Sequence, residues 1–210
     1  VAALYLKTCP DLAFIAEHCK SYKRGIGRRI KLGFISAFLG KHTIGKLFQG
    51  LINGLDRNQF EIIVFHLGPD RRLEEKYLAS LSDHVDHFLC VPSQYLQARM
   101  TISEMEPDII YYTDIGMEPV SYFLAFNRLA PVQCACWGHP VTTGIPNVDY
   151  FISWQIHEPK AASQHYSEEL ILFSGFCTNY YPPSFTSSIK GREAFGLSPD
   201  VNLYVCPQSL

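Results

Sequence analysis

The sequence predicts an α/β protein built around a mostly parallel β-sheet. Between residues 30 and 152, apolar runs of strand length alternate with segments in which apolar residues recur every three or four positions. Strands that are apolar on both faces and separated by helices are typical of parallel sheets covered on both sides. The clearest helix spans residues 44–55, where the apolar side chains form one stripe. We therefore expect right-handed crossovers, with the loops that follow the strands gathered along one edge.

In chain order, the first expected element is a helix over residues 1–22, which Gly25 and Gly27 end. The expected strands are apolar and rich in β-branched or aromatic residues, and they span residues 30–36, 60–67, 85–91, 108–113, 132–136, 148–152, 170–173 and 202–206. The expected helices after residue 30 span residues 44–55, 72–81, 94–105, 118–127, 161–166 and 190–195. The last of these ends at Gly196. Residues 179–188 are rich in Tyr, Pro and Ser and are predicted to form a linker.

Composition excludes several classes of function. The chain has 210 residues, of which 47% are hydrophobic and 18% charged, as in ordinary soluble globular proteins. The net charge of −2 argues against a nucleic-acid or membrane-surface partner, and no apolar run has transmembrane length. No signal peptide is evident, and we expect a cytoplasmic protein. Because the chain begins at Val1 and stops just after an apolar run, we expect it to be a fragment.

The cysteines and histidines do not predict a metal site. The seven cysteines lack Cys-x-x-Cys spacing, and Cys134 and Cys136 alternate along one strand, which predicts reduced thiols on the same face. There is no Asp-x-Asp motif. His84 and His87 flank a strand start, but two nitrogens without a third ligand make a weak metal site.

The loop at residues 137–144 is a candidate ligand site. It lies between two predicted strands and contains two glycines, one proline, one histidine and two threonines. Glycines allow close approach to the backbone, and open α/β sheets bind ligands at loops on strand ends. His42 and Asp114 also follow predicted strands, so we expect them at the same edge. The alternative is an ordinary joint between strands with a surface histidine.

Four segments of the chain together resemble one protein family. They read Ala-Pro-Val-Gln at 130–133, Trp-Gly-His-Pro-Val-Thr-Thr-Gly at 137–144, Val-Asp-Tyr-Phe-Ile-Ser at 148–153 and His-Tyr-Ser-Glu-Glu-Leu at 165–170. The family is that of the O-linked N-acetylglucosamine transferases and their bacterial SPINDLY-like relatives, including the protein N-glucosyltransferases. The resemblance implies the glycosyltransferase B fold, in which two Rossmann-like halves face each other across a cleft.

This resemblance implies a division of the chain into three parts. Residues 1–29 would be the helical tail of an upstream region, expected to contain repeats, together with a linker. Residues 30–178 would form the N-terminal Rossmann-like catalytic lobe. Residues 179–210 would hold a linker and the first strand of a nucleotide-binding lobe that is mostly absent from the chain.

The resemblance also implies site residues. His42 matches a histidine that lies in the active site of family members; the alternative is a helix-start histidine that bonds locally. The donor-sugar pocket of relatives is matched by Gly138, His139, Pro140, Thr142 and Thr143. The two threonines either bond the sugar or complete the turn. Gln208 lies near a nucleotide-contacting glutamine of relatives, and no residue here matches the essential lysine that follows it.

The implied reaction is an inverting, metal-independent transfer of a sugar, with N-acetylglucosamine as first choice, from a UDP-sugar to Ser or Thr of acceptor proteins. No cofactor is implied, because the UDP-sugar is a co-substrate, and the fragment alone is expected to be inactive. Two alternatives stay open: a UDP-glucose-dependent Asn glucosyltransferase and an inactive protein-binding module. The module is favoured by Phe38 and Cys9, which stand where relatives carry an aspartate and a histidine. Asp114 is the one nearby carboxylate that could compensate; its alternative is a solvated loop acid.

Overall fold

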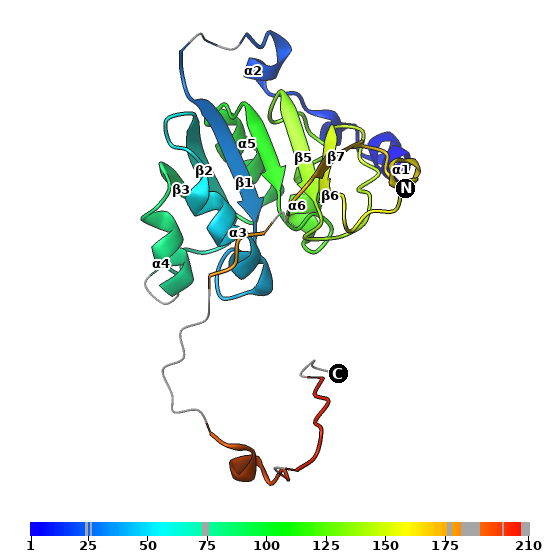
Figure 1. The fold of residues 1–210 in the computed structure, drawn as a ribbon. Coiled ribbons are helices and arrows are strands. Elements are labelled where there is room, and N and C mark those ends of the chain that lie inside the picture. The colour runs from blue at the N-terminus through cyan, green and yellow to red at the C-terminus, as the bar shows by residue number, and fades with distance from the viewer. Residues whose placement is uncertain are drawn as a thin grey trace.

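A seven-stranded, wholly parallel β-sheet forms the centre of the molecule (Figure 1). The computed structural model describes residues 1–23, 25, 27–72, 76–175, 178–181, 190–198 and 200–206. The strands are β1 (Ile30–Ser36), β2 (Phe60–Leu67), β3 (His87–Val91), β4 (Ile109–Tyr112), β5 (Val132–Cys136), β6 (Tyr150–Trp154) and β7 (Glu169–Phe173). The central strands β1, β2, β4 and β5 are largely buried, whereas the two edge strands are not: β3 is partly exposed and β7 is largely exposed.

Helices cover both faces of the sheet. They are α3 (Thr43–Gly54), α4 (Lys76–Ser82), α5 (Tyr95–Glu104) and α6 (Pro119–Leu124), preceded by α1 (Ala2–Thr8) and α2 (Glu17–Lys20). The apolar sides of α3 and α4 pack on one face, and those of α5 and α6 pack on the other. The described residues also form three short 3₁₀ helices: η1 (Pro10–Ala13), η2 (Ala162–His165) and η3 (Arg192–Phe195).

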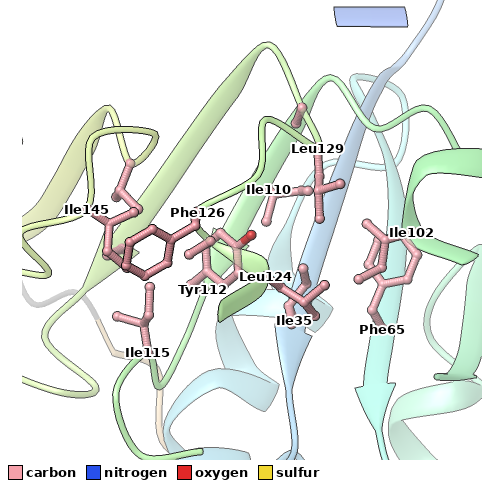
Figure 2. Close-up of a cluster of buried hydrophobic side chains, with 14 of the residues drawn as sticks. Ile35, Phe65, Ile102, Ile110, Tyr112, Ile115, Leu124, Phe126, Leu129 and Ile145 are labelled. Atoms are coloured by element: carbon pink, nitrogen blue, oxygen red, sulfur yellow. The ribbon is translucent and has the colours of Figure 1, made fainter. Parts of the chain in front are cut away.

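Alternate residues of each central strand supply two separate apolar cores. On β1, Phe34 belongs to the core under α3 and α4, whereas Ile35 belongs to the core under α5 and α6. Figure 2 shows the second core, which includes Ile35, Tyr112 and Phe126. Cys134 and Cys136 both face the first core, as their spacing predicts. The two cores hold the strand ends, and therefore the loops that follow them, in fixed positions.

The strand order is β3-β2-β1-β4-β5-β6-β7. The chain builds outward from β1 to β3 and then returns to the other side of β1 to add β4, so the order reverses between β1 and β4. In open α/β sheets, ligands bind beside such a reversal, outside the carboxyl ends of the strands. We call this side of the sheet the carboxyl edge, and it carries the loops after Ser36, Tyr112 and Cys136.

Most predicted elements are confirmed, with strands β1, β2 and β5 at the expected bounds. The helix expected over residues 1–22 is wrong, because the segment forms three short helices instead. Pro10 begins the second of them and cannot continue the first, since it lacks a backbone N–H. Ile15 is extended and forms a β-bridge with Arg128, which separates the second piece from the third. Ala2 and Leu12 are buried in the core under α5 and α6.

The strand expected at residues 202–206 is also absent: these residues have no regular structure and are exposed. A strand needs a partner strand to satisfy its backbone, and no described residue supplies one here. The short helix that ends at Gly196 is confirmed as η3, and Gly196 adopts the left-handed conformation that closes it. The division of the chain at residues 29 and 178 remains a prediction.

Candidate functional site

A cavity of about 420 Å³ opens at the carboxyl edge beside the ends of β1 and β2. Its lining comes from the loop after β1, the end of β2 and the loop that follows it, Ser93 after β3, and the start of α6. The residues that bear charge or a titratable ring are Lys41, His42, His66, Arg71 and Glu118. Cationic side chains therefore outnumber carboxylates around this cavity, and α3 begins beside it at Thr43. A helix N-terminus and neighbouring cations favour an anionic group.

His42 lies in this cavity and begins α3. Its Nδ1 accepts a hydrogen bond from the backbone N–H of Ile44 at 3.2 Å. A neutral imidazole that accepts through Nδ1 carries its proton on Nε2, so the second nitrogen is a hydrogen-bond donor. The position therefore combines both alternatives drawn from the sequence, because His42 bonds locally at the helix start and also lines the cavity. The Nε2–H group of His42 can donate a hydrogen bond to an oxygen of a ligand.

Phe38 packs directly on His42. The two ring centroids lie 4.8 Å apart and the rings are tilted by 35°. In the described part of the chain, the His42 imidazole makes its hydrogen bond to Ile44, and no carboxylate is among its partners. An apolar ring thus covers one side of the His42 imidazole.

Asp114 is buried at the reversal of the sheet, and the prediction of a solvated loop acid is wrong. Its carboxylate accepts hydrogen bonds from Ser36 Oγ at 2.9 Å and from Thr113 Oγ1 at 3.2 Å. Ser36 Oγ in turn accepts the backbone N–H of Phe38 at 2.8 Å. Asp114 therefore holds the first turn of the loop at residues 37–42, which presents His42, and does not contact His42 itself.

The environment of Asp114 favours its neutral form. Burial raises the pKa of this carboxyl to about 6, against the opposing effect of the hydrogen bonds from Ser36 and Thr113. The nearby charge of Glu118 raises the pKa further. Asp114 thus titrates close to neutral pH beneath the carboxyl edge.

The second part of the carboxyl edge is the loop at residues 137–144, which we call the His139 loop. Its base is fixed by Trp137, which stacks on Phe48 with ring centroids 5.3 Å apart. Gly138 lies against the backbone after β4, and a Cβ atom there would come 1.8 Å from the carbonyl oxygen of Thr113. Glycine is therefore required at this position by close backbone packing.

His139 stands over Gly116, on the loop after β4. A Cβ atom at Gly116 would lie 2.9 Å from Cδ2 of His139, and Gly116 has a φ of +95°. The His139 ring donates or accepts no hydrogen bond within the described ranges, so both ring nitrogens are available to a ligand. Pro140 follows it and is exposed. A smaller cavity of about 120 Å³ lies here, lined by His139 with Gly116, Thr142 and Thr143.

Thr142 and Thr143 complete the turn, one of the two alternatives that the sequence leaves open. Both hydroxyl groups donate to the carboxylate of Glu168, Thr142 Oγ1 at a distance of 2.7 Å. Each hydroxyl has a single hydrogen to donate, and both hydrogens are spent on this carboxylate. The assignment of these threonines to a sugar stays a prediction.

The expected site residues thus fall into two groups that flank the loop after β4. His42 lines the larger cavity and His139 the smaller one, and the two cavities share no lining residue. Gln208 lies outside the described residues. Cys9 is exposed and lines an apolar hollow beside α6, which shares Val120 with the lining of the His42 cavity.

Five polar residues of the site were missed in the sequence. Lys41, His66 and Arg71 line the His42 cavity, but their neighbours along the chain give no signal of it. Glu118 accepts the backbone N–H of Ser121 at 2.7 Å and caps α6; the Glu-Pro pair at the start of a helix is a signal that could have located it. Glu168 lies in the segment His-Tyr-Ser-Glu-Glu-Leu, which was recognised without a role.

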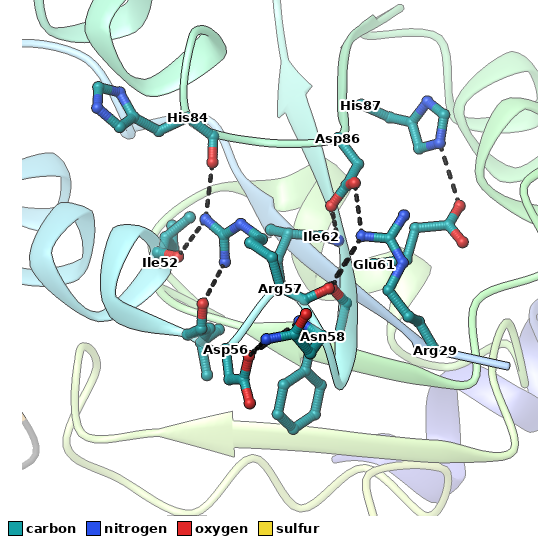
Figure 3. A network of polar contacts seen from close by, with 12 residues as sticks. Arg29, Ile52, Asp56, Arg57, Asn58, Glu61, Ile62, His84, Asp86 and His87 are labelled. Carbon is teal, nitrogen blue, oxygen red and sulfur yellow. Dashed lines mark hydrogen bonds and ion pairs between the residues drawn. The ribbon is translucent and has the colours of Figure 1, made fainter. Parts of the chain in front are cut away.

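The opposite edge of the sheet is closed by a polar network (Figure 3). Arg57 donates to the carbonyl oxygens of Ile52 and His84, which ties the end of α3 to the loop before β3. Arg29 pairs with Asp86 at 2.7 Å. His87 bonds to Glu61 at 3.1 Å, so the two histidines near this strand serve local contacts. No group of three or more potential metal ligands occurs among the residues that the structure describes.

The fold and the carboxyl edge define a class of protein: a Rossmann-like α/β lobe with a cavity beside the reversal of its sheet. Residues 12–178 match glycosyl transferase family 41, and the chain belongs to this family of glycosyltransferases. Within the described ranges, no helix is a candidate to span a membrane.

Two proteins with sequences similar to this chain are named as probable N-acetylglucosaminyltransferases. A probable UDP-N-acetylglucosamine–peptide N-acetylglucosaminyltransferase of Arabidopsis thaliana, SEC, is 23% identical over 191 residues, which cover 88% of this chain and 19% of that protein. A probable enzyme of the same kind from Petunia hybrida, SPINDLY, is 36% identical over 72 residues, covering 34% of this chain and 7% of that protein. The chain therefore spans a fifth or less of these relatives.

A solved structure confirms the fold class. The O-GlcNAc transferase of Thermobaculum terrenum, as its K341M mutant, superposes with a TM-score of 0.71 at 22% sequence identity. The match covers 87% of this chain and 35% of that one. The expected fold, a Rossmann-like lobe of the glycosyltransferase B type, is thereby confirmed.

Proposed function

We propose that this chain forms part of a protein glycosyltransferase that transfers a sugar from a UDP-sugar to Ser or Thr of acceptor proteins. N-acetylglucosamine is the first choice of sugar, because relatives are named for its transfer to peptides. The observation that carries the proposal is the family match over residues 12–178, which includes both histidine-bearing loops of the carboxyl edge. The nucleotide would be held by a second lobe outside this chain.

The chemistry asks three things of the site. The acceptor oxygen forms a bond to the anomeric carbon while the bond from that carbon to the diphosphate breaks, and the acceptor hydroxyl loses its proton as UDP leaves. The diphosphate must be stabilised, the sugar held for attack from the opposite face, and the acceptor oriented. We assign donors and cations of the carboxyl edge to the first two tasks, in keeping with the inverting, metal-independent mechanism that we propose.

We assign His42 to orientation. With Nδ1 occupied by the backbone of Ile44, its Nε2–H is a donor directed to an oxygen of the sugar or of the acceptor. A base would need a free lone pair on that nitrogen, so the resting geometry favours a donor role. His139, with both ring nitrogens available, is assigned to the donor sugar together with the backbone of Gly138 and the exposed face of Pro140.

The free cysteines support a cytoplasmic location for this reaction. They are Cys9, Cys19, Cys90 and Cys134 in the described part of the chain. Free thiols are typical of proteins in reducing compartments.

A second function is favoured by one observation. Phe38 packs on His42 in place of an acid, which leaves the histidine without a charged orienting partner among the described residues. This arrangement supports a protein-binding module that keeps the fold without the activity. Transfer of glucose to Asn is the alternative within the enzyme class.

The test uses the full-length gene product and measures UDP release from UDP-N-acetylglucosamine and from UDP-glucose, each with and without a cell lysate as acceptor. Acceptor-dependent release with one donor is the expected result, and it identifies the sugar. Release with UDP-glucose alone would favour the glucosyltransferase. A folded protein that releases no UDP from either donor would overturn the proposal in favour of the binding module.

A further inference from the structure

Glu168 is a buried carboxylate at the centre of a hydrogen-bond network that no part of the proposed chemistry uses. It precedes β7 and is 6% exposed. It accepts hydrogen bonds from the backbone N–H of Thr143 at 2.8 Å, from Thr142 Oγ1 at 2.7 Å and from Thr143 Oγ1. Ser167 Oγ adds a further bond at 3.1 Å. One carboxylate thus accepts four donors, three of which belong to the His139 loop.

The two threonine hydroxyl oxygens also accept hydrogen bonds from the backbone. Thr142 Oγ1 accepts the backbone N–H of Ser167 at 3.1 Å, and Thr143 Oγ1 accepts that of Ile145 at 3.1 Å. Each hydroxyl therefore donates to Glu168 and accepts from the backbone. Such a pattern fixes the loop backbone and leaves these oxygens little capacity for a ligand.

The ionised form of Glu168 suits this network. Burial would raise the pKa of its carboxyl, but the hydrogen bonds from Thr143 and Thr142 outweigh burial, and the pKa lies below its usual value. A carboxylate has only acceptor sites, so it takes all four donors at once. An amide of the same size has one oxygen and one NH₂ group, and the NH₂ group would face a hydroxyl that is already a donor.

Near its start, the His139 loop carries His139, whose ring is not part of the Glu168 network. His139 lies over Gly116 with both ring nitrogens available, and the backbone N–H of Val141 bonds to the His139 carbonyl at 2.8 Å. The segment that holds His139 is thus short and is tied at one end by Trp137 against Phe48 and at the other by the threonines. Its shape depends on both ties.

We propose that Glu168 is a positioning residue of the sugar site, which holds the His139 loop in the shape that presents His139 and the Gly138 backbone to the donor sugar. The role in sugar binding rests on the proposed function, whereas the anchoring of the loop does not. Glu168 contacts no reacting atom in this assignment. It acts through Thr142 and Thr143.

The kinetic test compares Glu168→Gln with Glu169→Gln, the neighbouring exposed acid on β7. In the full-length protein, Glu168→Gln should raise the KM for the UDP-sugar about 10-fold, the effect expected for losing one hydrogen bond to a charged group. The inhibition constant of UDP, which lacks the sugar, should stay within 2-fold, roughly the scatter of such measurements. Glu169→Gln should match the wild type. An unchanged KM in Glu168→Gln, or an equal loss for UDP, would overturn the role in sugar binding.

A second readout needs no activity. Hydrogen exchange followed by mass spectrometry on peptides that cover residues 137–145 should be about 10-fold faster in Glu168→Gln than in Glu169→Gln. Equal exchange in both variants would overturn the anchoring itself. If exchange is faster in Glu168→Gln but the wild-type protein neither binds nor uses a UDP-sugar, the anchor would be retained and the proposed function overturned.

A milder variant guards against misfolding of Glu168→Gln. Thr142→Val removes one donor to Glu168 at an exposed position. It should speed exchange of the same peptides about 3-fold, as expected for loss of one of several bonds in a network. No change in exchange with Thr142→Val would contradict the anchor independently of the Gln variant.

Discussion

Replacing Asp114 by Asn should change how the stability of this protein depends on pH. Asp114 is fully buried, and burial raises the pKa of its carboxyl from the usual 3.8 to about 6. Between these two values the folded protein holds a proton that the unfolded chain has released. Wild-type stability should therefore be fully present below about pH 4 and fall as the pH rises through about 6.

The magnitude follows from the same values. A rise from 3.8 to about 6 corresponds to about 3 kcal/mol, at about 1.36 kcal/mol for each pH unit. Asn keeps the size of Asp and carries no charge at any pH. Its Oδ1 can accept from Thr113, and its NH₂ group can donate to Ser36 Oγ. The effect of these changed hydrogen bonds on stability is therefore nearly independent of pH.

The assay is urea-induced unfolding, followed by tryptophan fluorescence at pH 4 and pH 8. The free energy of unfolding of Asp114→Asn, minus that of wild type, should be about 3 kcal/mol larger at pH 8 than at pH 4, so that the variant is relatively more stable at pH 8. Asp83→Asn, which removes an exposed carboxylate beyond α4, controls for the loss of charge. A relative stability that does not change with pH would show that burial leaves the Asp114 carboxyl unperturbed, and a change in the opposite direction would refute the reasoning.

Three further substitutions test the two loops of the carboxyl edge. Gly138→Ala should destabilise the fold by about 3 kcal/mol, since its Cβ would lie 1.8 Å from the Thr113 carbonyl oxygen; Gly54→Ala, which meets no atom within 4 Å, is the control, and equal melting temperatures would contradict the packing. His42→Ala should lower kcat of the full-length enzyme roughly 10²-fold, because it removes the Nε2–H donor. It should also lower stability by about 1 kcal/mol, because it removes the side-chain acceptor for the Ile44 N–H at the start of α3. His42→Asn keeps a capping oxygen and should recover the stability alone; recovery of the rate as well would reduce His42 to a helix cap.

The sheet could be predicted from the sequence because its signal is local. Strands β1, β2 and β5 are apolar runs bounded by turn residues, and their bounds follow from a few consecutive side chains. The helix expected over residues 1–22 failed for two reasons: Pro10 interrupts it, which is a local signal in the sequence itself, and a second break comes from a distant residue. Ile15 is extended because it pairs with Arg128, a residue far away in the sequence, and the apolar periodicity of the segment carries no trace of that pairing.

The candidate site was predictable in position but not in detail. Parallel strands bring their carboxyl ends to one edge, which is enough to predict that His42, Asp114 and the His139 loop share it. The burial of Asp114 was not predictable, because it depends on Ser36 from a neighbouring strand. Glu168 was missed because its partners lie 25 and 26 residues earlier in the chain, so their contact exists only in the folded structure.

The measurement that tests the central claim most directly is mass spectrometry of acceptor proteins incubated with the full-length protein and UDP-N-acetylglucosamine. We expect one N-acetylhexosamine on Ser or Thr residues, at a level that falls steeply with His42→Ala and is unaffected by Glu169→Gln. Absence of the modification from a folded protein, with UDP-glucose equally inert, would contradict a sugar-transfer site at the carboxyl edge and leave a binding module in its place.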